Sequence, residues 1–303
     1  MLRGEDVVPV PEPGEPPFVT RFAPSPTGLL HLGHAYSALF AQQTAQACGG
    51  RFLLRIEDID HTRCRAEFEQ AMLDDLRWLG LRWEAPAARQ STRIDAYQAA
   101  LARLRREALI YPCFCTRQQI RTEIQHSASA PHGPSGEAVY PGTCRGLDPG
   151  EAERRIARGQ PHAWRLDVAR ALERTGELFW HDVRGGWQTC RAMEFGDVVL
   201  ARKDIPTSYH LAVTLDDAAQ GVTLVTRGED LFHATHVHRL LQAVLDLPTP
   251  HYYHHNLVAG PDGQRLAKRN RSVSLRYFRE RGETPESVFE KLGLTARSSA
   301  TCG

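Results

Sequence analysis

Lysine is scarce in this chain of 303 residues, because only three of its 37 basic residues are lysines and the others are arginines. An excess of charge is missing too, since 37 basic residues face 36 acidic ones, and overall charge therefore gives no argument for a nucleic-acid partner. Apolar runs are short, and none approaches the roughly 20 residues that span a bilayer, which excludes an integral membrane protein. Nucleotide bias in the gene is the simplest reason for the missing lysines, but any lysine at a chemically sensible place becomes worth inspecting.

A secretion signal is absent as well. Residues 1–17 are acidic and rich in proline, with no apolar stretch after a basic one, and they predict a flexible lead-in instead of a signal peptide. The seven cysteines are an odd number in a chain too long to need disulfides for its stability. We therefore expect a cytoplasmic protein whose thiols are free or bind a metal.

The N-terminal third alternates between strand and helix patterns. We expect a strand at 18–22, a helix at 32–48, a strand at 51–56, and helices at 66–79 and 93–109. A Pro/Gly turn follows the first strand, and Gly49-Gly50 ends the first helix. This order of strand, glycine turn, helix and strand is how a doubly wound α/β domain begins.

The middle of the chain has another character. From 111 to about 187 it combines clustered cysteines with short alternating pieces such as Ala163–Asp167, which indicates an inserted module with its own stabilisation. The α/β pattern is expected to resume at 197–200, with a later strand at 222–226 and a helix at 234–247. Near the C-terminus, Thr284-Pro285 predicts one capped helix that ends at about Leu292.

The turn after the first strand, within Arg21–His34 (RFAPSPTGLLHLGH), is the first candidate site. It lies between a strand and a helix, where open α/β sheets bind ligands, and a helix start presents N–H groups to phosphates. His31 and His34 share one face of the first helical turn, and Gly33 lets a nucleotide approach closely. Both histidines could bind ATP phosphates and stabilise charge at the α-phosphorus. From these residues alone, a surface helix with solvated histidines remains the alternative.

The same stretch resembles the class I aminoacyl-tRNA synthetases, in the glutamyl branch, whose first motif reads R-F-A-P-S-P-T-G-x-x-H-[IL]-G-H. This chain matches it at every position. Three later stretches resemble further motifs of the branch, in the same order: Arg55–Arg63 (R-I-E-D-T-D-x-x-R), Ser208–Asp217 (Y-[NH]-[LF]-A-V-V-V-D-D) and Thr226–Leu231 (R-G-x-D-L). The resemblance covers about Val19 to Asn270, nearly the whole chain.

The residue types in these motifs suit an amino acid with two carboxylates. Glu57 can accept hydrogen bonds from a substrate ammonium, while Arg21 and Arg227 can each bind a carboxylate, which fits glutamate better than glutamine. The resemblance implies that Tyr209 and Arg227 line the glutamate pocket. The pocket it implies contains Arg21, Phe22, Ala23, Pro24, Ser25, Glu57, Tyr209 and Arg227. Without it, Glu57 reads as a solvated charge, Tyr209 as a half-buried structural residue and Arg227 as a solvated strand end.

Lys268 stands where class I enzymes carry the K-M-S-K-S loop. The match is partial, because Arg265, Ala267 and Arg269 replace other motif residues, but the second lysine is kept. The resemblance implies that Lys268 contacts ATP phosphates, and a compact ammonium on a mobile loop suits pyrophosphate neutralisation. It implies a catalytic set of His31, His34 and Lys268, with Gly33 added for ATP binding.

Three cysteines, at 113, 115 and 144, predict a metal site in the inserted module. Cysteines two apart can chelate a tetrahedral ion, and three thiolates are one ligand short. His126, His132 and Tyr140 are the candidates for the fourth ligand, and general chemistry favours a histidine. The spacing resembles the zinc site of the branch that acts on queuosine, which implies Tyr140. Three reduced cysteines in a decayed site are the alternative. The trio His251, His254 and His255 imitates no metal motif and is expected to be packed or solvated.

The resemblance implies a fold and a division of the chain. The fold is a Rossmann-like, doubly wound parallel sheet with an inserted zinc-bearing α+β module and a short helical C-terminus. The expected ranges are a flexible segment at 1–17, the two halves of the catalytic domain at 18–110 and 190–260, the module at 111–189, and the lysine loop with C-terminal helices at 261–303.

The stretch after the lysine loop bears on the expected function. Only 35 residues follow Lys268, whereas a full glutamyl-tRNA synthetase continues into a large anticodon-reading region. The resemblance therefore implies the branch that activates glutamate with ATP, without needing tRNA, and glutamylates queuosine in the anticodon of tRNA(Asp). We expect ATP with Mg²⁺, L-glutamate and queuosine-bearing tRNA(Asp) as partners, one structural Zn²⁺, no membrane contact and a monomer. The alternatives are a minimal enzyme charging the 3′ end of tRNA(Glu), a non-catalytic paralogue, and a small-molecule acceptor.

Overall fold

The first three strands form a parallel sheet. The computed structural model describes residues 8–126, 139–258 and 273–294. Its first sheet has the order β1 (Val19–Phe22), β2 (Arg51–Ile56) and β3 (Glu84–Arg89). The strand expected at 51–56 is confirmed as β2, and five of its six residues are buried, as is typical of a parallel strand covered on both faces.

A second sheet continues this one. Its order is β7 (Gly186–Thr189), β6 (Phe179–Asp182), β10 (His251–His255) and β9 (Leu224–Gly228), with β7 alone antiparallel to its neighbour. β9 lies beside β1, because the Thr223 amide donates to the Val19 carbonyl (3.0 Å) and the Val19 amide donates to Thr223 Oγ1 (2.9 Å). The strand order therefore reverses between β1 and β9, which is where open α/β sheets bind ligands.

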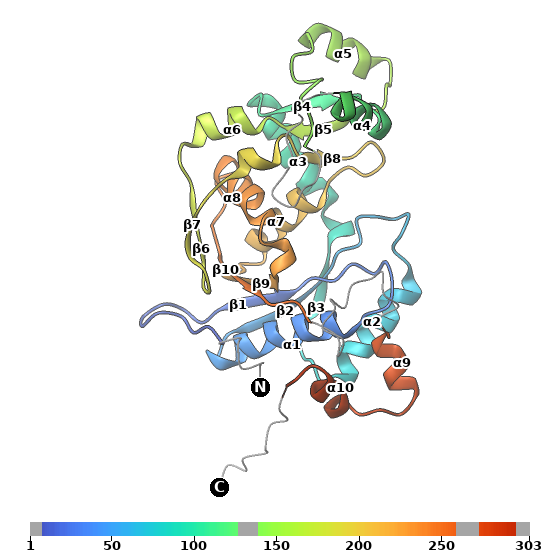
Figure 1. Ribbon diagram of the computed structural model, residues 1–303, viewed down its shortest axis with the longest axis vertical. Coiled ribbons are helices and arrows are strands. Elements are labelled where there is room, and N and C mark those ends of the chain that lie inside the picture. Colours follow the sequence, from blue (N-terminus) through green and yellow to red (C-terminus); the bar gives the residue numbers. More distant parts are fainter. Residues whose placement is uncertain (1–7, 127–138, 259–272, 295–303) are drawn as a thin grey trace.

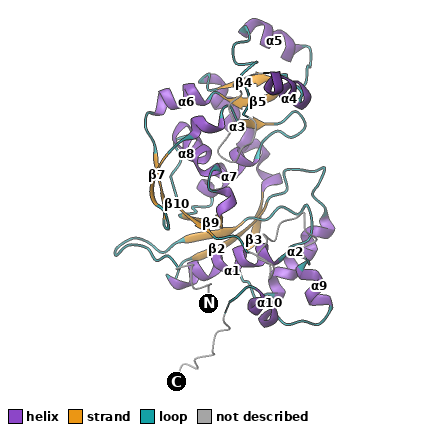
Figure 2. Cartoon of the chain, viewed as in Figure 1, coloured by secondary structure: helices purple, strands orange, loops and turns teal. Residues whose placement is uncertain are grey.

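Helices cover both faces of these strands. In Figure 2, α1 (Leu32–Ala47) and α2 (Ala66–Trp78) lie on one side, and α3 (Ile94–Arg106), α7 (Tyr209–Ala219) and α8 (Ala234–Val244) on the other. One core cluster packs α1 against β1 and β2, with Tyr36 and Phe40 fully buried. A second packs α3, α7 and α8 together. The expected helices at 32–48, 66–79, 93–109 and 234–247 are confirmed to within a few residues, and three-residue to four-residue 3₁₀ turns lie at Gln90–Arg93, Ala192–Phe195 and Glu229–Leu231.

The elements between α3 and β6 form the upper part of Figure 1 and correspond to most of the module expected at 111–189. Its sheet has the order β4 (Ile110–Cys113), β5 (Ala163–Leu166) and β8 (Val199–Ala201), and it is antiparallel. The module also contains α4 (Arg117–His126), α5 (Pro149–Ala157) and α6 (Val168–Thr175). The alternating pattern at 163–167 is confirmed as β5.

Two assignments near the end of the module are wrong. The strand expected at 197–200 exists as β8, but it pairs with β5 and does not resume the parallel sheet. Conversely, β6 and β7 lie in the range expected for the module and instead extend the sheet of β10. The reason is tertiary packing, because the fully buried Trp180 of β6 contacts His236 of α8 and Tyr252 of β10. Local alternation reveals a strand but not its partner.

The remaining elements lie at the edges. β3 was not predicted, because its Glu-Ala-Pro-Ala-Ala-Arg sequence has little strand propensity and is tolerated at the edge of the sheet. The C-terminal part has α9 (Leu275–Glu280) and α10 (Pro285–Lys291), and the expected cap is confirmed, since Thr284 Oγ1 accepts from the Ser287 amide. Among the described helices, none is both long and apolar enough to cross a membrane.

Candidate active site

One cavity gathers most of the residues that the motifs singled out. It has a volume of about 630 Å³ and opens where β1, β2, β9 and β10 end at their carboxyl edge. The predicted site residues that line it are Arg21, Phe22, Ala23, Pro24, Ser25, His31, Gly33, His34, Glu57, Tyr209 and Arg227. Lys268 lies outside the described residues. Ser37, Asp230 and His255 also line the cavity and were not predicted.

Arg21 is held by an acid. Its Nε and Nη2 donate to the two carboxylate oxygens of Asp217 (3.0 and 3.3 Å), and its Nη1 donates to the Thr226 carbonyl (3.1 Å). Arg55, which is fully buried, donates to Asp217 Oδ1 (2.7 Å) and to Glu57 Oε1 (3.2 Å). Burial raises the pKa of Asp217, but the two guanidiniums outweigh it and lower that pKa. Asp217 therefore positions Arg21 and, through Arg55, also Glu57.

A second acid, Asp216, belongs to the same network of ion pairs but does not line the cavity. It is fully buried and accepts hydrogen bonds from Arg93 Nε (2.6 Å), the Tyr97 phenol (2.8 Å) and Gln90. Three carboxylates of the network thus face three guanidiniums. The carboxylates belong to Glu57, Asp216 and Asp217, and the guanidiniums to Arg21, Arg55 and Arg93.

Arg227, on β9, has a different environment. Its side chain is buried, and no carboxylate lies within 4.0 Å of it in the part of the chain that the structure describes. Its Nε donates to His254 Nε2 (3.1 Å), and its Nη1 contacts the Tyr209 phenol and His238 Nδ1 (3.3 Å each). Its Nη2 donates to the hydroxyl of Thr235. The positive charge of Arg227 therefore has no negative partner among these neighbours.

The two histidines of the first motif begin α1. His31 is the N-cap residue, and its Nδ1 accepts from the Gly33 amide (3.1 Å), while His34 Nδ1 accepts from the His31 amide (3.2 Å). In the neutral rings the proton must then sit on Nε2, which makes each Nε2–H a donor suited to phosphate oxygens. A Cβ at Gly33 would lie 3.1 Å from the His31 ring, so a side chain there would press on this cap.

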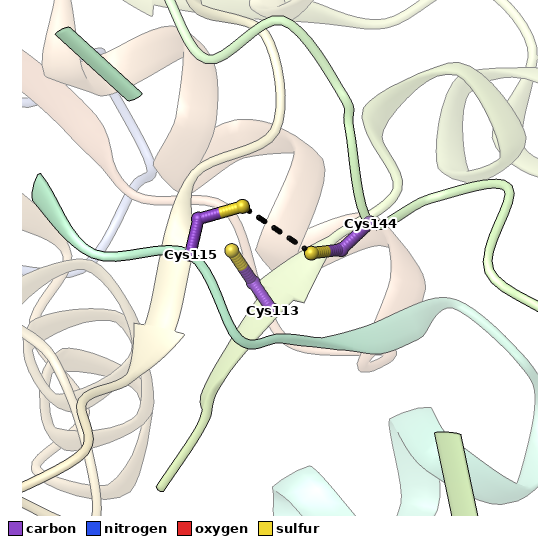
Figure 3. A group of neighbouring side chains, drawn as sticks. All are labelled: Cys113, Cys115 and Cys144. Atoms are coloured by element: carbon purple, nitrogen blue, oxygen red, sulfur yellow. Dashed lines mark hydrogen bonds between the residues drawn. The ribbon is translucent and has the colours of Figure 1, made fainter. Parts of the chain in front are cut away.

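The cysteines of the module come together as expected (Figure 3). The sulfurs of Cys113, Cys115 and Cys144 all lie within 4.8 Å of one another and could hold a metal ion. The Tyr140 phenol oxygen lies 3.4 Å from Cys113 Sγ and 3.7 Å from Cys115 Sγ, and it accepts from the Cys144 amide (2.9 Å). These separations resemble those between ligands of a tetrahedral zinc site, where Zn–S bonds are about 2.3 Å. His132 and the side chain of His126 lie outside what the structure describes.

Sequence reasoning missed the residues that support the site. Asp216 and Asp217 belong to a quoted motif, so their position was available although no role was assigned to them. Arg55 likewise opens a quoted motif. His238 and His254 carried no local signal, and His254 was expected only as part of a packed or solvated trio. Their role depends on α8 and β10 lying beside β9.

Comparisons with known proteins agree on one family. The model of the class I tRNA synthetases (E and Q), catalytic domain, matches residues 17–301. A glutamyl-Q tRNA(Asp) synthetase of Rhodobacter capsulatus is 49% identical over 91% of this chain and 100% of its own length. A glutamate–tRNA ligase 2 of Nitrosococcus oceani is 41% identical, over 89% of this chain and 57% of the ligase. A solved glutamate tRNA ligase of Elizabethkingia meningosepticum, in complex with its amino acid, superimposes with a TM-score of 0.75 at 26% identity, over 94% of this chain and 62% of that one.

Proposed function

This chain belongs to the class I tRNA synthetases for glutamate and glutamine, and on that premise we propose that it activates L-glutamate with ATP and transfers the glutamyl group to queuosine in the anticodon of tRNA(Asp). The higher identity to a glutamyl-Q tRNA(Asp) synthetase (49%) than to a glutamate–tRNA ligase 2 (41%) supports this acceptor. The observation that carries the choice of glutamate is the buried Arg227 without an acidic partner among the described residues.

The charges of the cavity support glutamate over glutamine. Three carboxylates and three guanidiniums around Arg21 form ion pairs with one another, whereas Arg227 forms none among the described residues. Asp230 also lines the cavity, but it forms no ion pair with Arg227. Glutamate offers Arg227 a second carboxylate as a partner, which glutamine lacks. In the proposed complex Arg227 and Arg21 bind the two carboxylates, and Glu57 binds the ammonium. Phe22, Ala23, Pro24, Ser25 and Tyr209 form the rest of the pocket.

Activation is a displacement at phosphorus. A carboxylate oxygen of glutamate attacks the α-phosphorus of ATP, and the bond to the β-phosphate oxygen breaks as pyrophosphate leaves. The Nε2–H groups of His31 and His34, together with Lys268, stabilise the developing negative charge, and Gly33 lies at the nucleotide. Mg²⁺ enters with ATP. A queuosine hydroxyl then attacks the carbonyl of the mixed anhydride, loses its proton, and displaces AMP.

The inserted module completes the proposal. Cys113, Cys115, Tyr140 and Cys144 would hold one Zn²⁺ that stabilises the module and takes no part in the chemistry. We also propose that the catalytic domain is Rossmann-like and doubly wound and that this module divides it. The protein is proposed to be monomeric and cytoplasmic.

The decisive experiment locates the transferred glutamate. The protein is incubated with ATP, labelled glutamate and tRNA(Asp) that contains or lacks queuosine, each also as a form without the 3′-terminal adenosine. Removing this adenosine prevents charging but leaves the anticodon intact. Label that requires queuosine and survives the removal supports the proposed function. Labelling that depends on the terminal adenosine, and is the same with and without queuosine, contradicts the proposed function. It favours charging of a 3′ end.

A further inference from the structure

The buried Arg227 is surrounded by hydrogen-bond acceptors that carry no charge. We infer that His254, held by Asp182, and His238, held by His210, are positioning residues that fix Arg227 through neutral nitrogens and so keep its full positive charge for a substrate carboxylate. The inference rests on the proposed use of glutamate and adds the residues that determine the preference for it over glutamine. Neither histidine lines the cavity.

The first half of this arrangement joins three strands. Arg227 of β9 can only donate, so His254 Nε2 on β10 must accept from it, and the ring proton must sit on Nδ1. That Nδ1 lies 2.6 Å from Asp182 Oδ2 at the end of β6, and both side chains are buried. The other oxygen of Asp182 accepts from the amides of Arg184 and Gly185 (3.0 and 2.8 Å). Asp182 is therefore oriented by the backbone and in turn fixes the tautomer of His254.

The second half joins two helices. His238 of α8 presents Nδ1 to Arg227 Nη1 (3.3 Å), so its Nε2 carries the proton and donates to His210 Nδ1 of α7 (3.2 Å). Burial, and then the charge of Arg227, lower the pKa of His210 to about 4 and the pKa of His238 well below its ordinary value. For His254, burial lowers the pKa to about 4, although Asp182 opposes the shift. All three rings are therefore neutral near pH 7.

Neutral acceptors solve a problem that acids would create. A carboxylate beside Arg227 would position the guanidinium but would also cancel the charge that attracts the substrate. Here the carboxylate that holds His254, that of Asp182, is separated from Arg227 by the imidazole ring. The guanidinium also lies over the ring of Tyr252, 5.5 Å from its centroid, which holds a cation without neutralising it.

A matched pair of variants tests the charge directly. The side chain of glutamine reaches the position of His254 Nε2 as a neutral acceptor, and that of glutamate reaches the same position with a negative charge. We expect His254→Glu to raise the KM for glutamate about 100-fold above that of His254→Gln in glutamate-dependent pyrophosphate exchange, with the KM for ATP alike in both. The preference for glutamate over glutamine should also be lower in His254→Glu than in His254→Gln. His238→Asp and His238→Asn form a second pair of the same design.

A third variant tests the orientation. In Asp182→Asn the oxygen keeps its two backbone amides, so the amide nitrogen faces His254 and forces its proton onto Nε2, against a donor of Arg227. We expect the KM for glutamate to rise about 10-fold while the KM for ATP stays as in the wild type. A merely structural role would change both constants and the melting temperature together.

The outcomes separate this inference from the proposed function. Equal KM values for glutamate within the pairs at both histidines would overturn the inference, even if the wild type activates glutamate as proposed. A wild type that binds glutamate in calorimetry but exchanges no pyrophosphate would overturn the proposed function instead. In that case the binding constants of the same pairs still test the inference. If His254→Glu does not fold, as judged by its thermal melting, the comparison of His238→Asp with His238→Asn decides the question.

Discussion

Arg21 and Arg227 approach one cavity from the neighbouring strands β1 and β9, yet they are held in opposite ways. Arg21 forms a two-pronged ion pair with Asp217, which also binds the buried Arg55. Arg227 is held by two histidines, a tyrosine and a threonine, all uncharged. The difference shows two uses of the same side chain: Arg21 is part of a network of ion pairs, whereas Arg227 has no ion-pair partner among the residues that the structure describes.

The two uses have different physical consequences. A buried ion pair is costly to break, because removing one partner leaves the other charge desolvated and alone. Changes in the ion pairs of Arg21, Asp217 and Arg55 should therefore affect stability as much as substrate binding. A buried cation with neutral acceptors gains from any anion that enters, so the Arg227 side should govern binding more than stability. Variants on each side can separate these effects.

The largest effect is expected when the charge of Arg227 is removed. Arg227→Ala should lower kcat/KM for glutamate in pyrophosphate exchange by about 10³-fold or more, since it removes the buried cation that is proposed to bind a substrate carboxylate. Arg227→Lys is the matched control, because it keeps the charge but loses the planar fork, and it should retain part of the activity. Near-normal exchange by Arg227→Ala would show that Arg227 does not bind the substrate.

The next largest effect is expected when the ion pairs of Arg21 are disrupted. Asp217→Asn should lower the free energy of unfolding by about 3 kcal/mol, because Arg21 and Arg55 lose a shared buried partner. It should also raise the KM for glutamate, since Arg21 and Glu57 are no longer positioned. Asp216→Asn is the control: it also removes a buried carboxylate, but it leaves the partner of Arg21 in place. Denaturant unfolding and exchange kinetics measure the two quantities, and equal KM changes in both variants would contradict the distinction.

A lower pH should destabilise the uncharged surroundings of Arg227, because it protonates His254. The folded-state pKa of His254 is about 4, below the ordinary value near 6.5, so between these values the unfolded chain binds more protons than the folded one. Stability should therefore fall as the pH drops from about 6.5 to 4, by about 1.4 kcal/mol per pH unit for this histidine. Denaturant unfolding across this range should give a flatter dependence for His254→Gln than for the wild type. Parallel curves would show that His254 is not kept neutral by the fold.

The smallest effect on activation is expected away from both arginines. Cys144→Ser should lower the zinc content and the melting temperature, because it removes one of the clustered sulfurs of the module. Pyrophosphate exchange with glutamate should change less than about threefold, since the cluster takes no part in binding glutamate or ATP. Metal analysis and exchange kinetics on the same preparation provide the check. A loss of exchange as large as that of Arg227→Ala would mean that the module shapes the cavity directly.

The motifs located most of the cavity in advance, and the reason is geometric. Arg21 lies near the end of β1 and Ser25 follows that strand, Glu57 follows β2, and Arg227 lies one residue before the end of β9. Each therefore lies at the carboxyl edge of a parallel strand. Those edges meet in one place in an open sheet, and a motif at a strand end therefore predicts a shared site. The roles of these residues, and that of Lys268, stay predictions.

The arrangement of the strands could be predicted less well from the sequence. The pattern at 197–200 reveals a strand but not its sheet, and nothing local places β6 and β7 outside the module, because a strand's partner depends on contacts distant in sequence. β3 was missed because an edge strand needs few of the apolar residues that reveal a buried one.

The sequence by itself determined the family, the residues around the cavity and the chemistry they can offer, because these are carried by short stretches next to strand ends. Only the tertiary structure decided which arginine is neutralised and which keeps its charge. That outcome depends on Asp182, His238 and His254, which come from β6, α8 and β10 and meet Arg227 only when those elements pack against β9. Spacing along the chain fixes which groups share a turn or a face, but the electrostatic environment of a buried side chain is set by neighbours that folding brings from elsewhere.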